Sequence, residues 1–144
     1  MRHVVGKFYL VGCFLSMIAA APAFAAEPVK VVYHFTEGLE QSSRGLNNIR
    51  NHLQADPTAK IVVVSNGEGV AAVMDGAKGK NNQLLRNTIR ELTEKGVEFR
   101  ACQNTLTSRD LDLAKVIAEA KMVTSGVAEV ARLQSKEGYV YLKP

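Results

Sequence analysis

The chain has little cysteine: only Cys13 and Cys102 occur among its 144 residues, and tryptophan is absent. Two cysteines cannot build the framework of disulfides that supports many small secreted domains. Neither lies in a Cys-x-x-Cys pair, and His34 and His52 lack the spacing of metal ligands, so the sequence predicts no metal site and no cofactor. A Gly-x-Ser-x-Gly element is also missing, which argues against a serine hydrolase.

Runs of charge of one sign are missing as well. Acidic and basic residues are interspersed along the chain, and the net charge is only +4. No basic cluster with interleaved aromatic residues is present, so we expect no nucleic-acid partner. The length fits one domain with one hydrophobic core, and the sequence shows neither an internal repeat nor a low-complexity segment.

The N-terminal segment has the pattern of a secretory signal peptide. A basic start is followed by an apolar stretch over 8–21 and by Ala-Phe-Ala at 23–25, the small-x-small pattern of a cleavage site. We therefore expect a signal peptide over 1–25 and a single domain over 26–144, which is periplasmic and has no stable membrane insertion after cleavage. Two alternatives stay open: lipidation at Cys13, which ends a lipobox-like Leu-Val-Gly-Cys sequence, and an uncleaved N-terminal anchor.

Five short runs rich in β-branched and apolar residues alternate with amphipathic segments along this domain. Such runs are typical of buried strands, and their alternation with helices indicates a mostly parallel sheet covered on both faces. The predicted fold class is therefore α/β, with three layers (α/β/α) and a mostly parallel five-stranded sheet. The expected strands cover residues 29–35, 61–64, 97–102, 121–124 and 139–142.

Helices with one apolar face are predicted between these strands, because apolar residues recur at intervals of three or four. Asparagine, threonine and aspartate near their starts are typical capping residues. The first predicted helix has Leu46, Ile49 and Leu53 on its apolar face and ends before Pro57, and a short second helix covers 70–74. The third begins at a cap, Asn81 or Asn82, and has Leu85, Ile89 and Leu92 inward. The fourth begins at a Thr107–Asp110 capping pair and extends to Ile117, and the fifth covers 127–134.

Residues 67–72 (Gly-Glu-Gly-Val-Ala-Ala) fit the G-x-G-x-x-A pattern of dinucleotide-binding turns. The pattern follows the second predicted strand rather than the first, and Glu68 would place a negative charge beside a pyrophosphate. We therefore interpret these residues as a tight turn between a strand and a helix.

Small and polar residues follow the predicted strands at their carboxyl ends, where ligands bind to open α/β sheets. Cys102 ends one such strand, and it is the only cysteine outside the predicted signal peptide. A thiol is nucleophilic as a thiolate, and the start of a helix is one of the few places that stabilises this form. Cys102 is therefore the candidate catalytic residue, although a buried structural thiol is the alternative. The supporting candidates are His34, Ser65, Asn66, Asn104, Thr105 and Arg109.

These supporting residues have different expected roles. Asn104, Thr105 and Arg109 can supply hydrogen-bond donors or positive charge to a sulfur anion. His34 can carry a proton if its strand lies close to that of Cys102, or it can be a hydrogen-bonded residue without a role in chemistry.

Residues 96–106 (GVEFRACQNTL), 124–134 (TSGVAEVARLQ) and 138–141 (GYVY) resemble the DsrE/DsrF-like family of sulfur-relay proteins, and the resemblance extends over 28–143. It implies a small three-layer α/β domain that assembles as a homo-trimer or homo-hexamer. It also implies that Cys102 accepts sulfur as a persulfide and passes it to a thiol of a partner protein. The implied partners are sulfur donor and acceptor proteins.

The leading hypothesis is therefore a periplasmic sulfur-relay protein that carries sulfane sulfur on Cys102, in the manner of a sulfurtransferase. One alternative is a non-catalytic, oligomeric protein that binds a small ligand or a partner and has a structural Cys102. Another is a thiol redox protein, which would need a resolving cysteine from another subunit or from a partner. The sequence leaves open whether residues 139–142 face a core or an interface.

Overall fold

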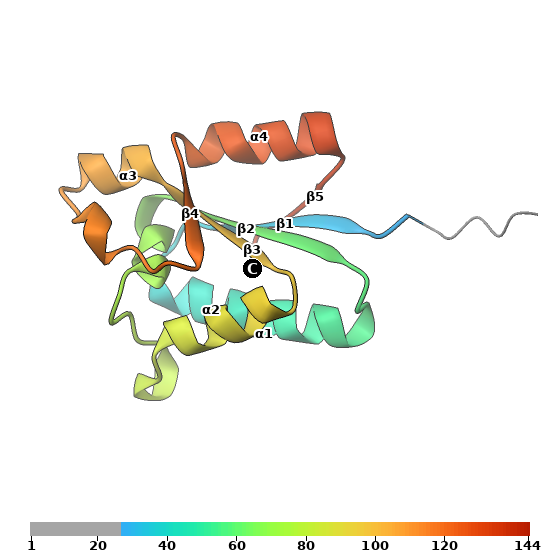
Figure 1. The fold of residues 1–144 in the computed structure, drawn as a ribbon, viewed down its shortest axis with the longest axis horizontal. Helices are drawn as coiled ribbons and strands as arrows, with labels where there is room; N and C mark the ends of the chain where they lie inside the picture. The colour runs from blue at the N-terminus through green and yellow to red at the C-terminus, as the bar shows by residue number, and fades with distance from the viewer. Residues whose placement is uncertain (1–26) are drawn as a thin grey trace, which may run out of the picture.

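The computed structural model describes residues 27–144, so the predicted signal peptide and Cys13 lie outside the described residues. A five-stranded sheet forms the centre of the domain (Figure 1). Its strands lie in the order β4-β3-β2-β1-β5, and all four neighbouring pairs are parallel. The predicted α/β class with a five-stranded sheet is therefore confirmed. In chain order the strands are β1 (Lys30–Phe35), β2 (Lys60–Ser65), β3 (Glu98–Cys102), β4 (Ala120–Val123) and β5 (Val140–Leu142).

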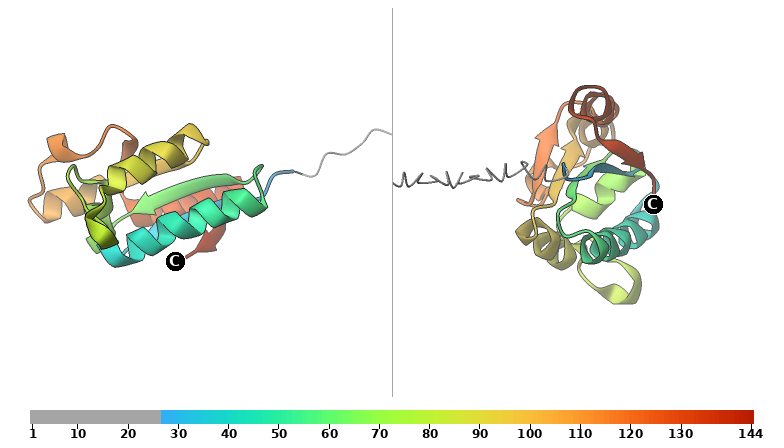
Figure 2. Two further views of the ribbon diagram at one scale, coloured as in Figure 1. Left: turned by 90° about the horizontal axis from the view of Figure 1, so that it is seen from below. Right: turned by 90° about the vertical axis from the view of Figure 1, so that its right-hand side faces the viewer.

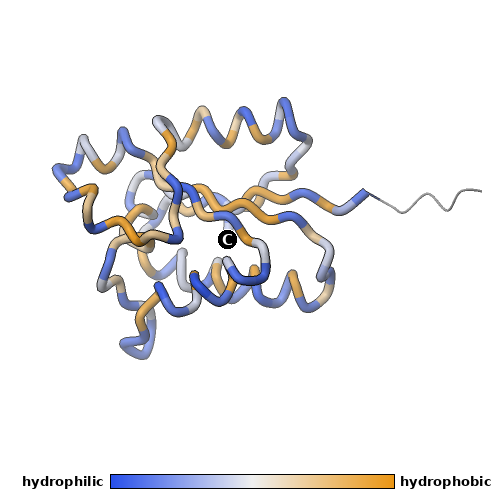
Figure 3. The backbone as a smooth tube through the Cα atoms, viewed as in Figure 1, coloured by the Kyte–Doolittle hydropathy of each residue, from blue (hydrophilic) through white to orange (hydrophobic). Residues whose placement is uncertain are grey.

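The central strands β1 and β2 are buried on both faces, which explains their continuous apolar sequences. Successive side chains of a strand point to opposite faces of the sheet. Val31 and Tyr33 of β1 join the larger core cluster on one face, whereas Val32 joins a smaller cluster on the other. The most apolar segments of the chain accordingly lie in these strands, while polar residues recur along the helices (Figure 3).

Helices cover both faces of the sheet and complete three layers. On one face α1 (Leu39–Ala55) and α2 (Leu85–Glu94) lie side by side, and α4 (Gly126–Glu137) covers the other face (Figure 2). Every third or fourth residue of these helices is buried, as the apolar spacing predicted. The buried apolar residues are Leu46 and Ile49 of α1, Leu85, Ile89 and Leu92 of α2, and Val130 and Leu133 of α4.

Short segments lie beyond the carboxyl ends of the strands. The 3-10 helix η1 (Gly67–Val73) follows β2, and α3 (Gln103–Ser108) follows β3, at the left of Figure 1. Gly67 has a φ of 53°, in the left-handed region, and a Cβ at Gly69 would lie 2.1 Å from the carbonyl oxygen of Phe35. The two glycines therefore serve a tight turn and a close backbone approach, as predicted from residues 67–72.

The predicted asparagine cap of α2 is wrong. The helix begins only at Leu85, and no side chain caps it. Asn81 and Asn82 belong instead to the 3-10 turn η2 (Lys80–Asn82), with φ values of 65° and 59°. Asparagine tolerates this left-handed region better than most residues, so both side chains suit a turn better than a cap.

The predicted capping pair of Thr107 and Asp110 is wrong in position. Because α3 begins directly after β3, Thr107 lies near its end, and Asp110 follows it with a left-handed φ of 54°. The rest of the predicted helix is reduced to the short 3-10 helix η3 (Leu113–Lys115). A helix start therefore lies immediately next to Cys102, closer than the sequence predicted.

Candidate functional site

Cys102 lies at the junction of β3 and α3. It is the last residue of the strand and the N-cap residue of the helix, and only 4% of its surface is exposed. It is the only cysteine among residues 27–144, and its thiol is free. The start of α4 approaches the same residue: a Cβ on Gly126 would lie 3.2 Å from that of Cys102, and the backbone N–H of Gly126 lowers the pKa of the thiol. The sulfur therefore lies where the N-terminal ends of two helices meet.

Four donors lower the pKa of the Cys102 thiol: the hydroxyl of Thr105 and the backbone N–H groups of Gly126, Thr105 and Asn104. Burial raises the pKa of the Cys102 thiol, but the four donors lower it by more, so the pKa lies below its ordinary value. The N–H of Asn104 is shared with the carbonyl of Thr124 at 3.1 Å and contributes least. This environment favours the thiolate, which is the nucleophilic form of cysteine.

A second hydrogen bond turns the hydroxyl of Thr105 toward the sulfur. Its Oγ1 accepts the N–H of Gly67, in the turn after β2, at 3.2 Å. A hydroxyl that accepts one hydrogen bond still has its own hydrogen to donate, and the Thr105 hydroxyl lowers the pKa of Cys102 in this way. The turn that resembled a dinucleotide-binding motif thus orients a donor for the thiol.

Gly126 lets α4 approach the sheet closely at this point. A Cβ on Gly126 would lie 2.9 Å from the Cβ of Asn66 and 3.2 Å from the Cβ of Cys102. An ion pair holds the helix in this position: Arg100 of β3 contacts Glu129 in the first turn of α4, and both side chains are largely buried. The donor from α4 therefore depends on a small residue and on a salt bridge.

Three polar side chains form a hydrogen-bonded chain beside the thiol. His34 lies between Asn66 and Tyr141, with Nε2 at 2.9 Å from Oδ1 of Asn66 and Nδ1 at 3.0 Å from the hydroxyl of Tyr141. Burial lowers the pKa of His34, the positive charge of Lys143 lowers it further, and the bond to Asn66 acts in the opposite direction. His34 is therefore neutral near pH 7, and Asn66 lies between it and Cys102.

The side chains of the other candidates are not among the groups that lower the pKa of the thiol. Ser65 is fully buried at the end of β2, and among the described residues its hydroxyl has no hydrogen-bond partner. Asn104 is exposed, and only its backbone N–H faces the sulfur. Arg109 ends α3 as its C-cap residue, so it lies at the opposite end of that helix from Cys102.

Sequence reasoning missed four residues that shape the site. Gly126 carried a signal, because a glycine between a strand end and an apolar helix often marks a close approach of backbones. Arg100 and Glu129 carried none, since 29 positions separate the two charges and they lie on different elements. Tyr141 was interpreted only as a core or interface residue, because the sequence does not say which strand lies next to β1.

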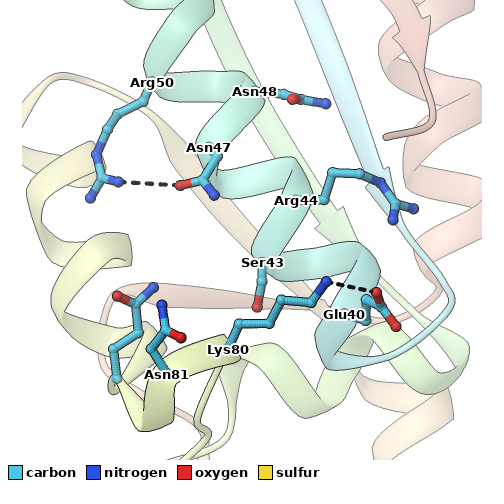
Figure 4. Close-up of a pocket in the computed structure, with 9 residues that line it drawn as sticks. Glu40, Ser43, Arg44, Asn47, Asn48, Arg50, Lys80 and Asn81 are labelled. Carbon is cyan, nitrogen blue, oxygen red and sulfur yellow. Dashed lines mark hydrogen bonds and ion pairs between the residues drawn. The ribbon is translucent and has the colours of Figure 1, made fainter.

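A polar hollow of about 480 Å³ lies elsewhere, between α1 and residues 80–83 (Figure 4). Two of its cations already have partners: Lys80 pairs with Glu40 at 3.0 Å, and Arg50 pairs with Glu91 at 2.6 Å. The lining contains neither Cys102 nor any group bonded to it. The hollow is therefore separate from the thiol site.

Residues 27–144 contain neither a cluster of metal ligands nor a helix of membrane-spanning length. No group of three or more histidine, cysteine, aspartate and glutamate side chains could hold a metal ion in this part of the chain. Within the same residues, no helix is long and apolar enough to cross a membrane.

The DsrE/DsrF-like family matches residues 29–144 of this chain. Among solved structures, the chain is similar to MTH1491, a protein of unknown function from Methanobacterium thermoautotrophicum, with 28% identity, a TM-score of 0.69, and coverage of 81% of this chain and 99% of that chain. It is also similar to the YchN protein from E. coli, with 14% identity, a TM-score of 0.64, and coverage of 82% and 99%, which shows a shared fold alone. A search of curated proteins finds no match. Because the family match spans nearly all of the described residues, the chain belongs to the DsrE/DsrF-like family.

Proposed function

We propose that the protein is a periplasmic sulfur carrier that holds sulfane sulfur as a persulfide on Cys102 and passes it to a thiol of a partner protein. One observation carries the proposal: the only cysteine of residues 27–144 lies at the start of α3 and against the start of α4, and the donors there lower the pKa of its thiol although it is buried. Membership of a family associated with sulfur relay supports it. The proposed partners are sulfur donor and acceptor proteins, and the proposed assembly is a homo-trimer or homo-hexamer.

The chemistry needs one nucleophile and no redox cofactor. In the loading step the Cys102 thiolate attacks the outer sulfur of a donor persulfide, R–S–SH. A sulfur–sulfur bond forms to Cys102 while the bond to the donor breaks, and the donor leaves as the thiolate R–S⁻. In the transfer step an acceptor thiolate attacks the outer sulfur, takes it with its proton, and releases Cys102 as a thiolate. Electrons and protons balance in both steps.

The same donors serve both steps. Before loading and after transfer, Cys102 carries a negative charge, which the N–H groups of Gly126 and Thr105 and the hydroxyl of Thr105 stabilise. Cys102 lies just below the surface, because the next residues, Gln103 and Asn104, are exposed. We expect a partner to approach the outer sulfur from the side of these two residues.

Incubation of the protein with a persulfide donor, followed by intact mass measurement, tests this function. We expect the wild type to gain the mass of one sulfur atom, and addition of a small thiol to remove it. Cys102→Ser should gain none, while Cys13→Ser controls for the second cysteine of the sequence. Absence of added sulfur on the wild type, or equal addition to Cys102→Ser, would contradict the proposal.

The alternative of an interaction protein with a structural Cys102 gives the opposite results. In that case the thiol would resist alkylation in the folded protein, and Cys102→Ala would keep both assembly and ligand binding. A thiol redox protein would instead form a disulfide between two copies or with a partner under mild oxidation, since Cys102 is the only cysteine of residues 27–144.

A further inference from the structure

The chain of Tyr141, His34 and Asn66 has a defined direction of hydrogen bonding. The Oδ1 of Asn66 can only accept, so Nε2 of His34 carries the hydrogen between them. His34 is neutral, and its Nδ1 must therefore accept the hydrogen of the Tyr141 hydroxyl. Each member thus fixes the orientation of the next, and Asn66 is the last.

The carboxamide of Asn66 is thereby held in one of its two orientations. With Oδ1 directed at His34, the NH₂ group is directed away from it. Asn66 and Cys102 lie close together, since a Cβ placed on Gly126 would be 2.9 Å from the Cβ of Asn66 and 3.2 Å from the Cβ of Cys102. Asn66 therefore presents an oriented NH₂ group in the neighbourhood of the Cys102 thiol.

A persulfide would need such a group. The donors from Gly126 and Thr105 bind the sulfur of Cys102 itself. A second sulfur lies about 2 Å farther out, at the length of a sulfur–sulfur bond. It becomes negatively charged when the loaded persulfide releases its proton to water, and it takes a proton back before transfer. It therefore requires a further donor beyond the four that surround the thiol.

We propose that Tyr141 and His34 are positioning residues that orient Asn66 so that its NH₂ group donates a hydrogen bond to the outer sulfur of a persulfide on Cys102. This inference rests on the proposed function and names the group that binds the cargo. Tyr141 acts through His34 and Asn66, and it does not touch the sulfur.

The test compares two rates in purified full-length protein: alkylation of the free thiol by iodoacetamide, and loss of sulfur from the loaded protein, followed by intact mass. In Asn66→Ala we expect sulfur loss to be about tenfold faster, the scale of one hydrogen bond to a charged group. In Tyr141→Phe we expect sulfur loss to be about threefold faster than in the wild type. Free-thiol alkylation should stay within about twofold of wild type in both variants, because the donors from Gly126 and Thr105 remain.

The double variant, Asn66→Ala with Tyr141→Phe, should lose sulfur no faster than Asn66→Ala alone, because Tyr141 acts only through Asn66. Tyr33→Phe is the matched control, since Tyr33 makes an equivalent bond of 3.0 Å to His52 on the other face of the sheet. That variant should not change sulfur loss.

Loading of the wild type with equal sulfur loss in all variants would overturn this inference and leave the proposed function intact. Full additivity of the two substitutions would overturn the role of Tyr141. If the wild type cannot be loaded, the proposed function and this inference both fail. Because Tyr141 is partly exposed, Tyr141→Phe keeps the test valid even if Asn66→Ala does not fold.

Discussion

At the scale of single residues, the sulfur of Cys102 depends on neutral donors and not on a nearby cation. Arg109, the cation expected to assist, lies at the far end of α3. Backbone N–H groups are fixed by the fold and need no side-chain ordering when charge develops on the sulfur. A site of this kind stabilises the thiolate at little entropic cost.

Replacing Thr105 by valine should raise the pKa of Cys102. The substitution removes the hydroxyl donor and keeps the backbone N–H groups. A loss of about 1.4 kcal/mol corresponds to one pKa unit, so the midpoint of the alkylation rate against pH should move up by about one unit. Thr107→Val, an exposed position of the same helix, is the control and should leave the midpoint unchanged. An unchanged midpoint in Thr105→Val would show that the hydroxyl does not stabilise the thiolate.

The same pKa shift affects stability with a definite sign. The pKa of the thiol is lower in the folded than in the unfolded protein. The folded state therefore binds fewer protons in the window between the two values, and the free energy of unfolding rises with pH across it. This contribution is lost as the pH falls through the folded-state pKa, and Cys102→Ser should remove it.

At the scale of elements, the sequence predicted strands better than helix starts. The strands are recognised from local runs of β-branched residues, and β1 and β2 end within a residue or two of their predicted bounds. The start of α3 is fixed by long-range bonds, such as that from the N–H of Asn104 to the carbonyl of Thr124. No side chain caps the start of α3, so the capping pattern of the sequence indicated Thr107 instead.

Glu129→Gln should loosen the contact of α4 with the sheet. The ion pair with Arg100 is largely buried, so its loss should lower the free energy of unfolding by about 2 kcal/mol, measured by urea denaturation. Hydrogen bonds from Arg132 hold the pKa of Glu129 low against the effect of burial, and Arg100 adds to this. The difference from wild type should therefore shrink as the pH falls through that lowered pKa.

Glu137→Gln provides the matched control on the same helix. Glu137 is exposed, and Arg132 is its only ion-pair partner among residues 27–144, so we expect a change within about 0.5 kcal/mol. Loosening of α4 in Glu129→Gln should also raise the pKa of Cys102, because the N–H of Gly126 would be held less firmly. Equal stability of the two variants would contradict the role assigned to the buried pair.

At the scale of the whole molecule, the strand-end rule predicted which residues gather around Cys102. The predicted alternation of strands and helices placed Cys102, Asn66 and Thr105 at one edge of the sheet, and the structure brings them together. Alternation alone does not give the order of the strands. The pairing of β5 with β1, which brings Tyr141 to His34, could therefore not be predicted.

The apolar residues of the edge strand β5 are exposed and not buried in the core. Val140, Tyr141 and Leu142 are 57%, 37% and 40% exposed, and one side of their backbone lacks a strand partner among the described residues. The unpaired N–H and C=O groups of an edge strand can pair with a strand of another chain. Of residues 139–142, only Tyr139 packs against the core, where it contacts the smaller buried cluster, and the other three are exposed.

We expect the predicted homo-oligomer to use this edge. Val140→Lys should shift the protein toward monomers in sedimentation velocity experiments, because a buried lysine without a partner disfavours association. Leu113→Lys alters a comparably exposed apolar residue on η3 and should leave the assembly unchanged. A wild type that sediments as a monomer at all concentrations would refute this expectation.

The pairing of β1 with β5 joins the first strand of the structure to the last. A chain that emerges from its N-terminus, from a ribosome or across a membrane, has β1 available long before β5. Until then the outer edge of β1 is open, and His34 lacks the hydroxyl of Tyr141. Folding of this domain therefore cannot be completed stepwise during emergence, and the thiol site reaches its final form only in the last stage of folding.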